Sequence, residues 1–188
     1  EPLHIRAFIL LTAPLQPFES IFTTPAAGGS SPCPPPLIVM PHGGPHSCFP
    51  CAFSPVVAFL TACGFATLQV NYRGSTGFGT EALESLPGRA GDQDLSDCML
   101  ALDGVHPLVD QSRVFVAGGS HGGFLGCHLS LADGRFRAAA VRNPVTNLAS
   151  MWGISDIPDW CLVEACGLGV DPRAVPTPEQ MAKMWASS

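Results

Sequence analysis

Gly118-Gly119-Ser120-His121-Gly122-Gly123 stands between two apolar segments of the chain, at 114–117 and 124–129. A strand that enters a helix through glycines on both sides of one serine has the pattern G-x-S-x-G, whose turn is too tight for larger neighbours. Such a turn holds the serine hydroxyl at the carboxyl end of the strand, near the amino end of a helix, where negative charge is stabilised. The pattern predicts that Ser120 is the nucleophile of an acyl-transfer reaction. The strand and helix context disfavours the alternative, a flexible glycine-rich loop.

Around this stretch the chain alternates between strand-like and helix-like segments. Short continuous apolar runs are typical of strands covered on both faces, and glycine or proline separates them from the helical segments. This order predicts an α/β domain whose sheet is at least partly parallel. We expect an edge strand at 3–11, a surface loop at 12–36, strands at 37–40, 65–70, 113–117 and 138–141, and helices at 53–63, at 92–105 and from the serine turn to 132.

Three glycine-rich segments, 42–45, 73–79 and 118–123, each follow a predicted strand. Ligands of open α/β sheets bind outside the carboxyl ends of the strands, so these segments should converge on one site. A serine hydrolase needs two backbone donors for the oxyanion, one from the residue after the nucleophile and one from a loop after an earlier strand. The first donor is then His121, and the segment His42-Gly43-Gly44-Pro45 provides the second, for which Gly44 is the candidate.

The general base is not evident from the sequence. In α/β-hydrolases an Asp or Glu and then a His follow the serine along the chain. After Ser120 the only histidines are His121 and His128. His121 is part of the glycine-rich turn itself, and His128 lies on the helix predicted to follow that turn. Three acidic candidates follow the serine without a later histidine to orient: Asp156, Asp159 and Asp171. The sequence therefore predicts a nucleophile without its base.

Composition restricts the class of protein. The 188 residues suffice for one domain with a sizeable core. Charged residues make up 13% of the chain and hydrophobic residues 46%. Typical soluble domains have about 25% charged residues, so much of the surface of this chain is expected to be buried inside it or against something else. The net charge is -6, and the nine Lys and Arg residues form no basic stripe. Nucleic acid is therefore not an expected partner.

No membrane span or secretory signal is expected. The region 47–72 contains no charged residue, but Pro50, Pro55 and Gly64 interrupt it. We interpret it as a buried helix followed by a buried strand. The first apolar run, at 8–11, is too short for a signal peptide. A cytoplasmic location is the expectation.

Two segments resemble cofactor sites in part, one a metal site and the other a nucleotide-binding loop. Cys48 and Cys51 form a C-x-x-C pair just after His42 and His46, which are ligand types that zinc uses. A structural zinc site usually takes its second ligand pair from a separate segment, so no metal is predicted. The segment 118–123 lacks the lysine and the spacing of nucleotide-binding loops. No cofactor is expected.

Five collinear segments together resemble the acylaminoacyl-peptidases of the prolyl oligopeptidase family. The resemblance covers about residues 36–166 and rests on the segments 37–46, 70–79, 118–124, 142–145 and 156–160. It implies an α/β-hydrolase fold with a doubly wound, mostly parallel sheet. It also implies an enzyme that releases N-acylated amino acids from blocked peptides, with Ser120 as nucleophile and the amides of His121 and Gly44 as oxyanion donors. His42, Arg73 and Asn143 lie in matching motifs and are candidates for the substrate side, with a structural role as the alternative.

The resemblance divides the chain into an edge strand with a Pro/Gly/Ser-rich loop at 1–35, a partial peptidase domain at 36–166 and a divergent tail at 167–188. It implies a truncated domain that lacks the last strands and the triad Asp and His they carry. Without those strands, the strand at 138–141 becomes an apolar edge that favours association. A homo-oligomer or an association with a complete subunit is therefore an expected arrangement. Two alternatives stay open: a non-catalytic binding module and a carboxylesterase-like hydrolase.

Overall fold

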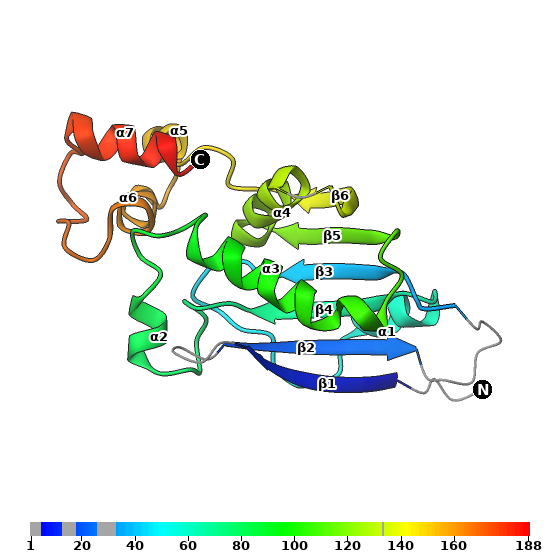
Figure 1. The fold of residues 1–188 in the computed structure, drawn as a ribbon. Coiled ribbons are helices and arrows are strands. Elements are labelled where there is room, and N and C mark those ends of the chain that lie inside the picture. Colours follow the sequence, from blue (N-terminus) through cyan, green and yellow to red (C-terminus); the bar gives the residue numbers. More distant parts are fainter. Residues whose placement is uncertain (1–4, 13–17, 26–32, 133) are drawn as a thin grey trace.

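The computed structural model describes residues 5–12, 18–25, 33–132 and 134–188. These residues form one mixed sheet with helices on both faces (Figure 1). The elements in chain order are β1 (Ile5–Thr12), β2 (Phe18–Pro25), β3 (Leu37–Pro41), α1 (Pro55–Ala62), β4 (Ala66–Asn71), α2 (Thr80–Glu84), α3 (Gln93–Val105), the 3-10 turn η1 (His106–Leu108), β5 (Val114–Gly119), α4 (His121–Ala132), β6 (Phe136–Arg142), α5 (Leu148–Ile154), α6 (Pro158–Cys166) and α7 (Pro178–Ala186).

The strands lie in the order β1-β2-β4-β3-β5-β6. β2 pairs antiparallel with β1 and β4, whereas β3, β4, β5 and β6 are mutually parallel. The predicted parallel unit of strand, helix and strand at 37–70 is confirmed. The carboxyl ends of the parallel strands share one edge of the sheet, and the helices α5, α6 and α7 gather beyond it (Figure 1).

The surface loop expected at 12–36 is wrong for residues 18–25, which form β2 inside the sheet. Phe18 is fully buried and Phe22 is 2% exposed, so the strand contributes two aromatic side chains to the core. The prolines and glycines on both sides dominate the composition of this region. As a result, the high β-propensity of the aromatic and β-branched residues in β2 is not evident from the composition of the region.

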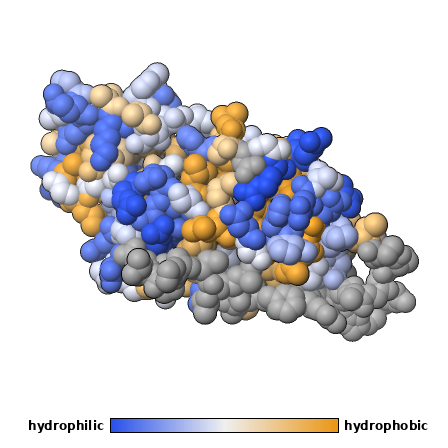
Figure 2. Space-filling model, in the orientation of Figure 1, coloured by the Kyte–Doolittle hydropathy of each residue, from blue (hydrophilic) through white to orange (hydrophobic). Residues whose placement is uncertain are grey.

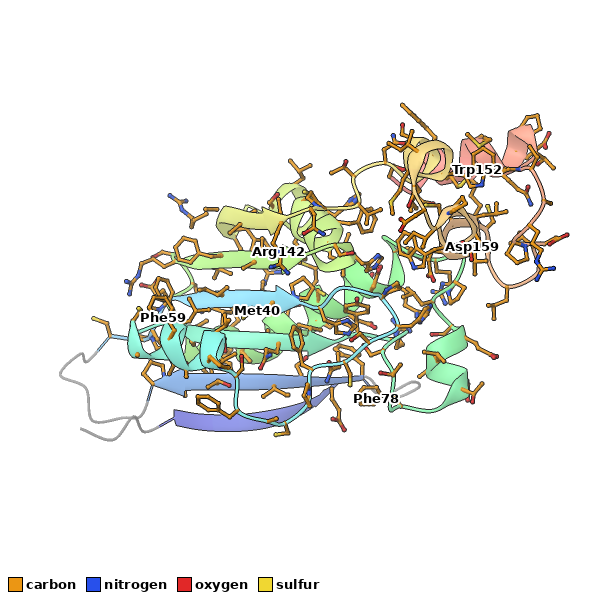
Figure 3. The ribbon with its side chains drawn as sticks, turned by 180° about the vertical axis from the view of Figure 1, so that it is seen from behind. Met40, Phe59, Phe78, Arg142, Trp152 and Asp159 are labelled. Carbon is orange, nitrogen blue, oxygen red and sulfur yellow. The ribbon has the colours of Figure 1, made fainter. Side chains whose placement is uncertain are left out.

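The helix expected at 53–63 exists as α1, but the expectation that it is buried is wrong. Only Val57 and Thr61 are buried, one turn apart on the face toward the sheet. Phe59 is 66% exposed and lies on this helix as seen in Figure 3. The uncharged sequence therefore reflects an apolar face that the described residues leave uncovered.

The other face of the sheet is covered by α3 and α4, as Figure 1 shows. Figure 2 views the molecule from this side, and hydrophobic side chains lie exposed between hydrophilic ones. Leu100 on α3 is 46% exposed and Leu131 on α4 is 87% exposed. None of the helices formed by the described residues is both long and apolar enough to cross a bilayer.

The segment 167–188, expected to diverge, folds back onto the molecule. Thr177 begins α7 with a capping box in which Thr177 and Gln180 each accept a hydrogen bond from the other's backbone. Met184 is fully buried in the core, and Leu148 donates a backbone hydrogen bond to the Ser188 hydroxyl at 2.8 Å. The segment therefore helps to hold α5 and α6 beside the carboxyl edge of the sheet.

Candidate active site

Ser120 occupies a strained turn between β5 and α4. Its φ is +56°, a left-handed conformation that side chains other than glycine rarely adopt. The flanking glycines are needed for close packing, because a Cβ on Gly118 would collide with the Gly122 carbonyl oxygen, and one on Gly122 would collide with that of Pro41. The backbone amide of Ser120 donates to the carbonyl oxygen of Arg142 on β6 at 3.0 Å. The structure thus has the geometry that the glycine spacing predicted.

Ser120 lines an open cavity of about 310 Å³ at the carboxyl ends of β3, β5 and β6. Gly43 packs directly against Ser120, since a Cβ on Gly43 would lie 3.3 Å from the Ser120 Cβ. The cavity is also lined by His42, Asn143 and two residues that the sequence analysis did not single out, Phe49 and Arg142. In Figure 3 the side chain of Arg142 lies over the sheet at this end of β5. Arg142 is the first residue of the matching segment 142–145, which was the signal for it in the sequence.

The two candidate oxyanion donors lie in neighbouring backbone segments, the start of α4 and the loop after β3. His121 is the first residue of α4, and the first amides of a helix have no acceptor within it. Gly44 follows Gly43 in the loop after β3, with a φ of +126° that favours glycine. In the part of the chain that the structure describes, neither amide donates a hydrogen bond.

The side chain of His121 points away from the cavity and is 2% exposed. Its Nε2 lies 2.7 Å from Oδ2 of Asp94 on α3, a carboxylate that is fully buried. The other oxygen of Asp94 accepts a hydrogen bond from the Gly91 amide at 2.8 Å. The pair therefore fixes the start of α4, and Asp94 is a contributor that the sequence analysis missed.

His42 holds the start of the loop that carries Gly43 and Gly44. Its ring stacks on Tyr72 with centroids 4.4 Å apart. Nε2 lies 2.7 Å from the Ser75 hydroxyl, and Nδ1 lies 2.7 Å from the carbonyl oxygen of Gly43. Burial lowers the pKa of His42 from 6.5 to about 4, so the ring is neutral near pH 7. Although His42 lines the cavity, both of its nitrogens are engaged elsewhere.

His46 holds the end of the same loop. Its Nδ1 lies 2.8 Å from the carbonyl oxygen of Gly74, and its Nε2 lies 3.0 Å from Glu164 on α6. The hydrogen bond with Glu164 raises the pKa of His46. Glu164 is a second carboxylate that the sequence analysis missed.

Arg73 is directed away from Ser120. Its guanidinium donates to both carboxylate oxygens of Asp97 on α3, the shortest bond being 2.7 Å, and its backbone amide donates to Asp97 at 2.8 Å. Burial raises the pKa of Asp97, although the bonds from Arg73 act in the opposite direction. This arrangement favours the structural role for Arg73 over the substrate-side role.

No histidine within the described ranges forms a hydrogen bond with the Ser120 hydroxyl. His42, His46 and His121 are engaged as described, and the ring of His128 packs against Phe124. Asp159 lies exposed at the start of α6, among the helices beyond the sheet edge (Figure 3). The described residues also contain no cluster of ligand side chains suited to a metal ion, and Cys48 and Cys51 are exposed free thiols.

Comparison with known proteins identifies the fold class and the family of this chain. The Pyrococcus horikoshii acylaminoacyl peptidase superposes with a TM-score of 0.80 at 21% identity, over 98% of this chain and 30% of that chain. Together with the serine turn, this likeness defines an α/β-hydrolase fold. The model of the prolyl oligopeptidase family matches residues 51–183, which extends beyond the expected limit at 166.

Curated relatives agree with this family. The acylamino-acid-releasing enzyme of Arabidopsis thaliana is 48% identical over 170 residues, covering 89% of this chain and 22% of that protein. The acylamino-acid-releasing enzyme of Homo sapiens is 53% identical over 133 residues, covering 69% of this chain and 18% of that protein. The chain thus spans about a fifth of the length of these relatives. It belongs to the prolyl oligopeptidase family of serine peptidases.

Proposed function

We propose that this chain is the nucleophile-bearing part of a serine peptidase that releases N-acylated amino acids from blocked peptides. The observation that carries the proposal is the strained Ser120 at the mouth of the cavity, between the segments that hold Gly44 and His121. The relatives named acylamino-acid-releasing enzymes support this substrate class. Residues 36–166 are proposed to form the peptidase part, as the resemblance of the sequence implies. A cytoplasmic location is also part of the proposal.

In the proposed reaction, Oγ of Ser120 attacks the carbonyl carbon of the scissile peptide bond. The amides of His121 and Gly44 bind the resulting oxyanion, which preorganised donors stabilise strongly in a site of this kind. Collapse of the tetrahedral intermediate expels the amine of the remaining peptide and leaves the acylated amino acid on Ser120 as an ester. Water then hydrolyses the ester.

The proton of Ser120 must pass to a base, and His42, His46 and His121, the histidines nearest to this site in the chain, are engaged elsewhere. We infer that the base comes from outside the described residues, for example from an associated complete subunit. Asn143 stays a candidate for the substrate side because it lines the cavity. His42 and Arg73 are proposed to support the site through their contacts with Ser75 and Asp97.

Labelling with a fluorophosphonate tests the nucleophile, because the reaction requires an activated hydroxyl. The purified chain should label slowly at Ser120, and added imidazole should accelerate labelling by supplying a base. Ser120→Ala should abolish the label. Ser130→Ala is the matched control, because Ser130 lies on α4 and its hydroxyl donates to the Cys127 carbonyl oxygen. Labelling that persists in Ser120→Ala contradicts the proposal. Fast labelling without imidazole contradicts the inference that the base comes from outside the described residues.

The engagement of the described histidines also favours a second candidate function, a non-catalytic module that binds acylated peptides. Binding of an acetyl-alanine peptide without any labelling of Ser120, even with imidazole, supports this second candidate. Turnover of an acetyl-alanine amide by the chain contradicts it.

A further inference from the structure

Each of the two amides proposed to bind the oxyanion lies close to a histidine that pairs with a buried carboxylate. His121 carries one of these amides, and its ring pairs with Asp94. His46 follows Gly44 by two residues, and its Nε2 lies 3.0 Å from Oε1 of Glu164, whose side chain is 3% exposed. The chain separates His46 from Glu164 by 118 residues. The tertiary structure therefore gives each of the two segments that carry these amides a histidine paired with a buried carboxylate.

The ring of His46 has an oxygen atom against each of its nitrogens. The carbonyl oxygen of Gly74, 2.8 Å from Nδ1, can only accept a hydrogen bond. A neutral imidazole has one N–H and can donate to only one of the two oxygens, whereas an imidazolium donates to both. The hydrogen bond with Glu164 raises the pKa of His46 above 6.5, which favours the imidazolium. Among the described residues, no hydrogen-bond partner faces Oε2, the second and buried oxygen of Glu164, and the hydrogen bond of this carboxylate is the one between Oε1 and His46.

The other titratable groups near the pair are neutral or have another partner. His121 lines the same small pocket as Glu164, but its Nε2 lies 2.7 Å from Asp94. His42, at the start of the same loop, is neutral because burial lowers its pKa to about 4. Tyr72 follows β4 and interacts with Glu164, and burial raises its pKa well above 10. The guanidinium of Arg73, in the neighbouring loop, is bound to Asp97.

The loop 42–46 is attached at both ends, and the candidate donor lies between the attachments. His42 joins its start to Ser75, and His46 joins its end to Gly74 and to α6. Gly44 lies only two residues before His46, and the Ser47 amide donates to the carbonyl oxygen of Pro45 at 2.9 Å, which closes a turn between them. A displacement of His46 therefore moves Gly44 relative to Ser120.

We propose that the His46–Glu164 ion pair positions the oxyanion hole, by fixing the end of the loop 42–46 and with it the amide of Gly44. This inference rests on the proposed function, and His46 acts as a positioning residue that does not touch the substrate. When the pH rises through the pKa of His46, the ring keeps one N–H and can no longer donate to both Gly74 and Glu164, so the end of the loop loses one of its two side-chain attachments. The order of the loop should therefore depend on pH.

Two measurements on the purified chain test this inference without requiring activity. Nitrogen-15 spectra of the imidazole rings report the protonation of His46. Amide hydrogen exchange of Ser47 and Thr76, which donate to the carbonyl oxygens of Pro45 and Ser47 at 2.9 Å, reports the order of the loop at its end. Glu164→Gln removes the charge but keeps the shape, and should lower the titration midpoint of His46. It should also speed the exchange of these amides below that midpoint by about tenfold, the change expected from one charge-assisted hydrogen bond. His128→Gln is the control, because His128 lies on α4 outside the loop, and it should change neither measurement.

A neutral His46 ring at pH 6.5 in the native chain overturns the inference, even if the variant fails to fold. Unchanged loop exchange in a folded Glu164→Gln also overturns it. Native exchange that rises with pH beyond its intrinsic dependence, around the His46 midpoint, supports it. Failure of fluorophosphonate labelling at Ser120 bears only on the proposed function, because the ring and amide measurements do not involve the nucleophile.

Discussion

At the scale of single residues, the two histidines of the loop 42–46 should have opposite effects on stability as the pH changes. The folded pKa of His42 is lowered to about 4, so its stabilising contribution is complete above pH 6.5 and is lost as the pH falls toward 4. A shift of that size corresponds to at most about 3 kcal/mol. The folded pKa of His46 is raised, so its contribution is complete below pH 6.5 and is lost as the pH rises.

Urea unfolding of the native chain and of His42→Gln at several pH values measures the first effect. The variant cannot titrate at this position, so the native advantage should shrink as the pH falls from 6.5 to 4. An advantage that stays constant over this range contradicts the neutral, buried state of His42.

Gly122 should tolerate no side chain, because its Cβ position overlaps the Pro41 carbonyl oxygen and lies 2.9 Å from the carbonyl carbon of His42. We expect Gly122→Ala to destabilise the chain by about 3 kcal/mol, since α4 would have to move away from the end of β3. Gly104→Ala is the matched control, because it lies in α3 with open space around it, and it should stabilise by about 0.5 kcal/mol. Equal unfolding free energies for the two variants would show that the predicted collision is relieved.

The residues proposed to carry the chemistry could be named from the sequence, but the residues that hold them in place could not. Ser120, His121 and Gly44 lie in local patterns whose spacing has a geometric reason. Asp94 and Glu164 act through partners that are 27 and 118 residues away, and no local pattern encodes those pairs. Their identification required the tertiary structure.

At the scale of elements, α7 offers a test of whether residues 178–186 fold as a helix. The Thr177 hydroxyl accepts from the Gln180 amide at 3.3 Å, and the Gln180 side chain accepts from the Thr177 amide at 2.8 Å. Thr177→Ala should lower the free energy of unfolding by about 1 kcal/mol, whereas Thr177→Ser should retain most of it. Urea unfolding followed by tryptophan fluorescence measures both, because α7 contains Trp185. Equal losses in the two variants would argue against the cap.

Elements with continuous apolar runs were predictable, and elements with mixed signals were not. β3 is buried along nearly its whole length, as its uninterrupted apolar sequence indicates, and β4 is fully buried although it alternates apolar residues with Thr67, Gln69 and Asn71. β2 was missed because turn-forming residues flank it closely on both sides. The burial of α1 was predicted wrongly because an uncharged helix need not have a partner on both faces.

At the scale of the whole molecule, β6 ends the described sheet and leaves an open edge. All of its residues after Phe136 are exposed, and its other side pairs with β5. An edge of this kind presents unpaired backbone groups that favour pairing with another strand. The chain should therefore associate with itself through β6, in accordance with the oligomer expected from the sequence.

Ala140→Lys tests this edge, because a lysine on an exposed edge strand disfavours strand pairing. Ala140 alternates along β6 with Val141, which packs toward Gly126 of α4, so the new side chain points to the face that α4 leaves uncovered. Sedimentation velocity should show that the native chain grows in mass with concentration, whereas the variant stays near 19.6 kDa. Gln111→Lys adds the same charge at an exposed turn and should still associate. If both variants remain monomeric, net charge and not the β6 edge controls association, and a native chain that never associates contradicts the prediction outright.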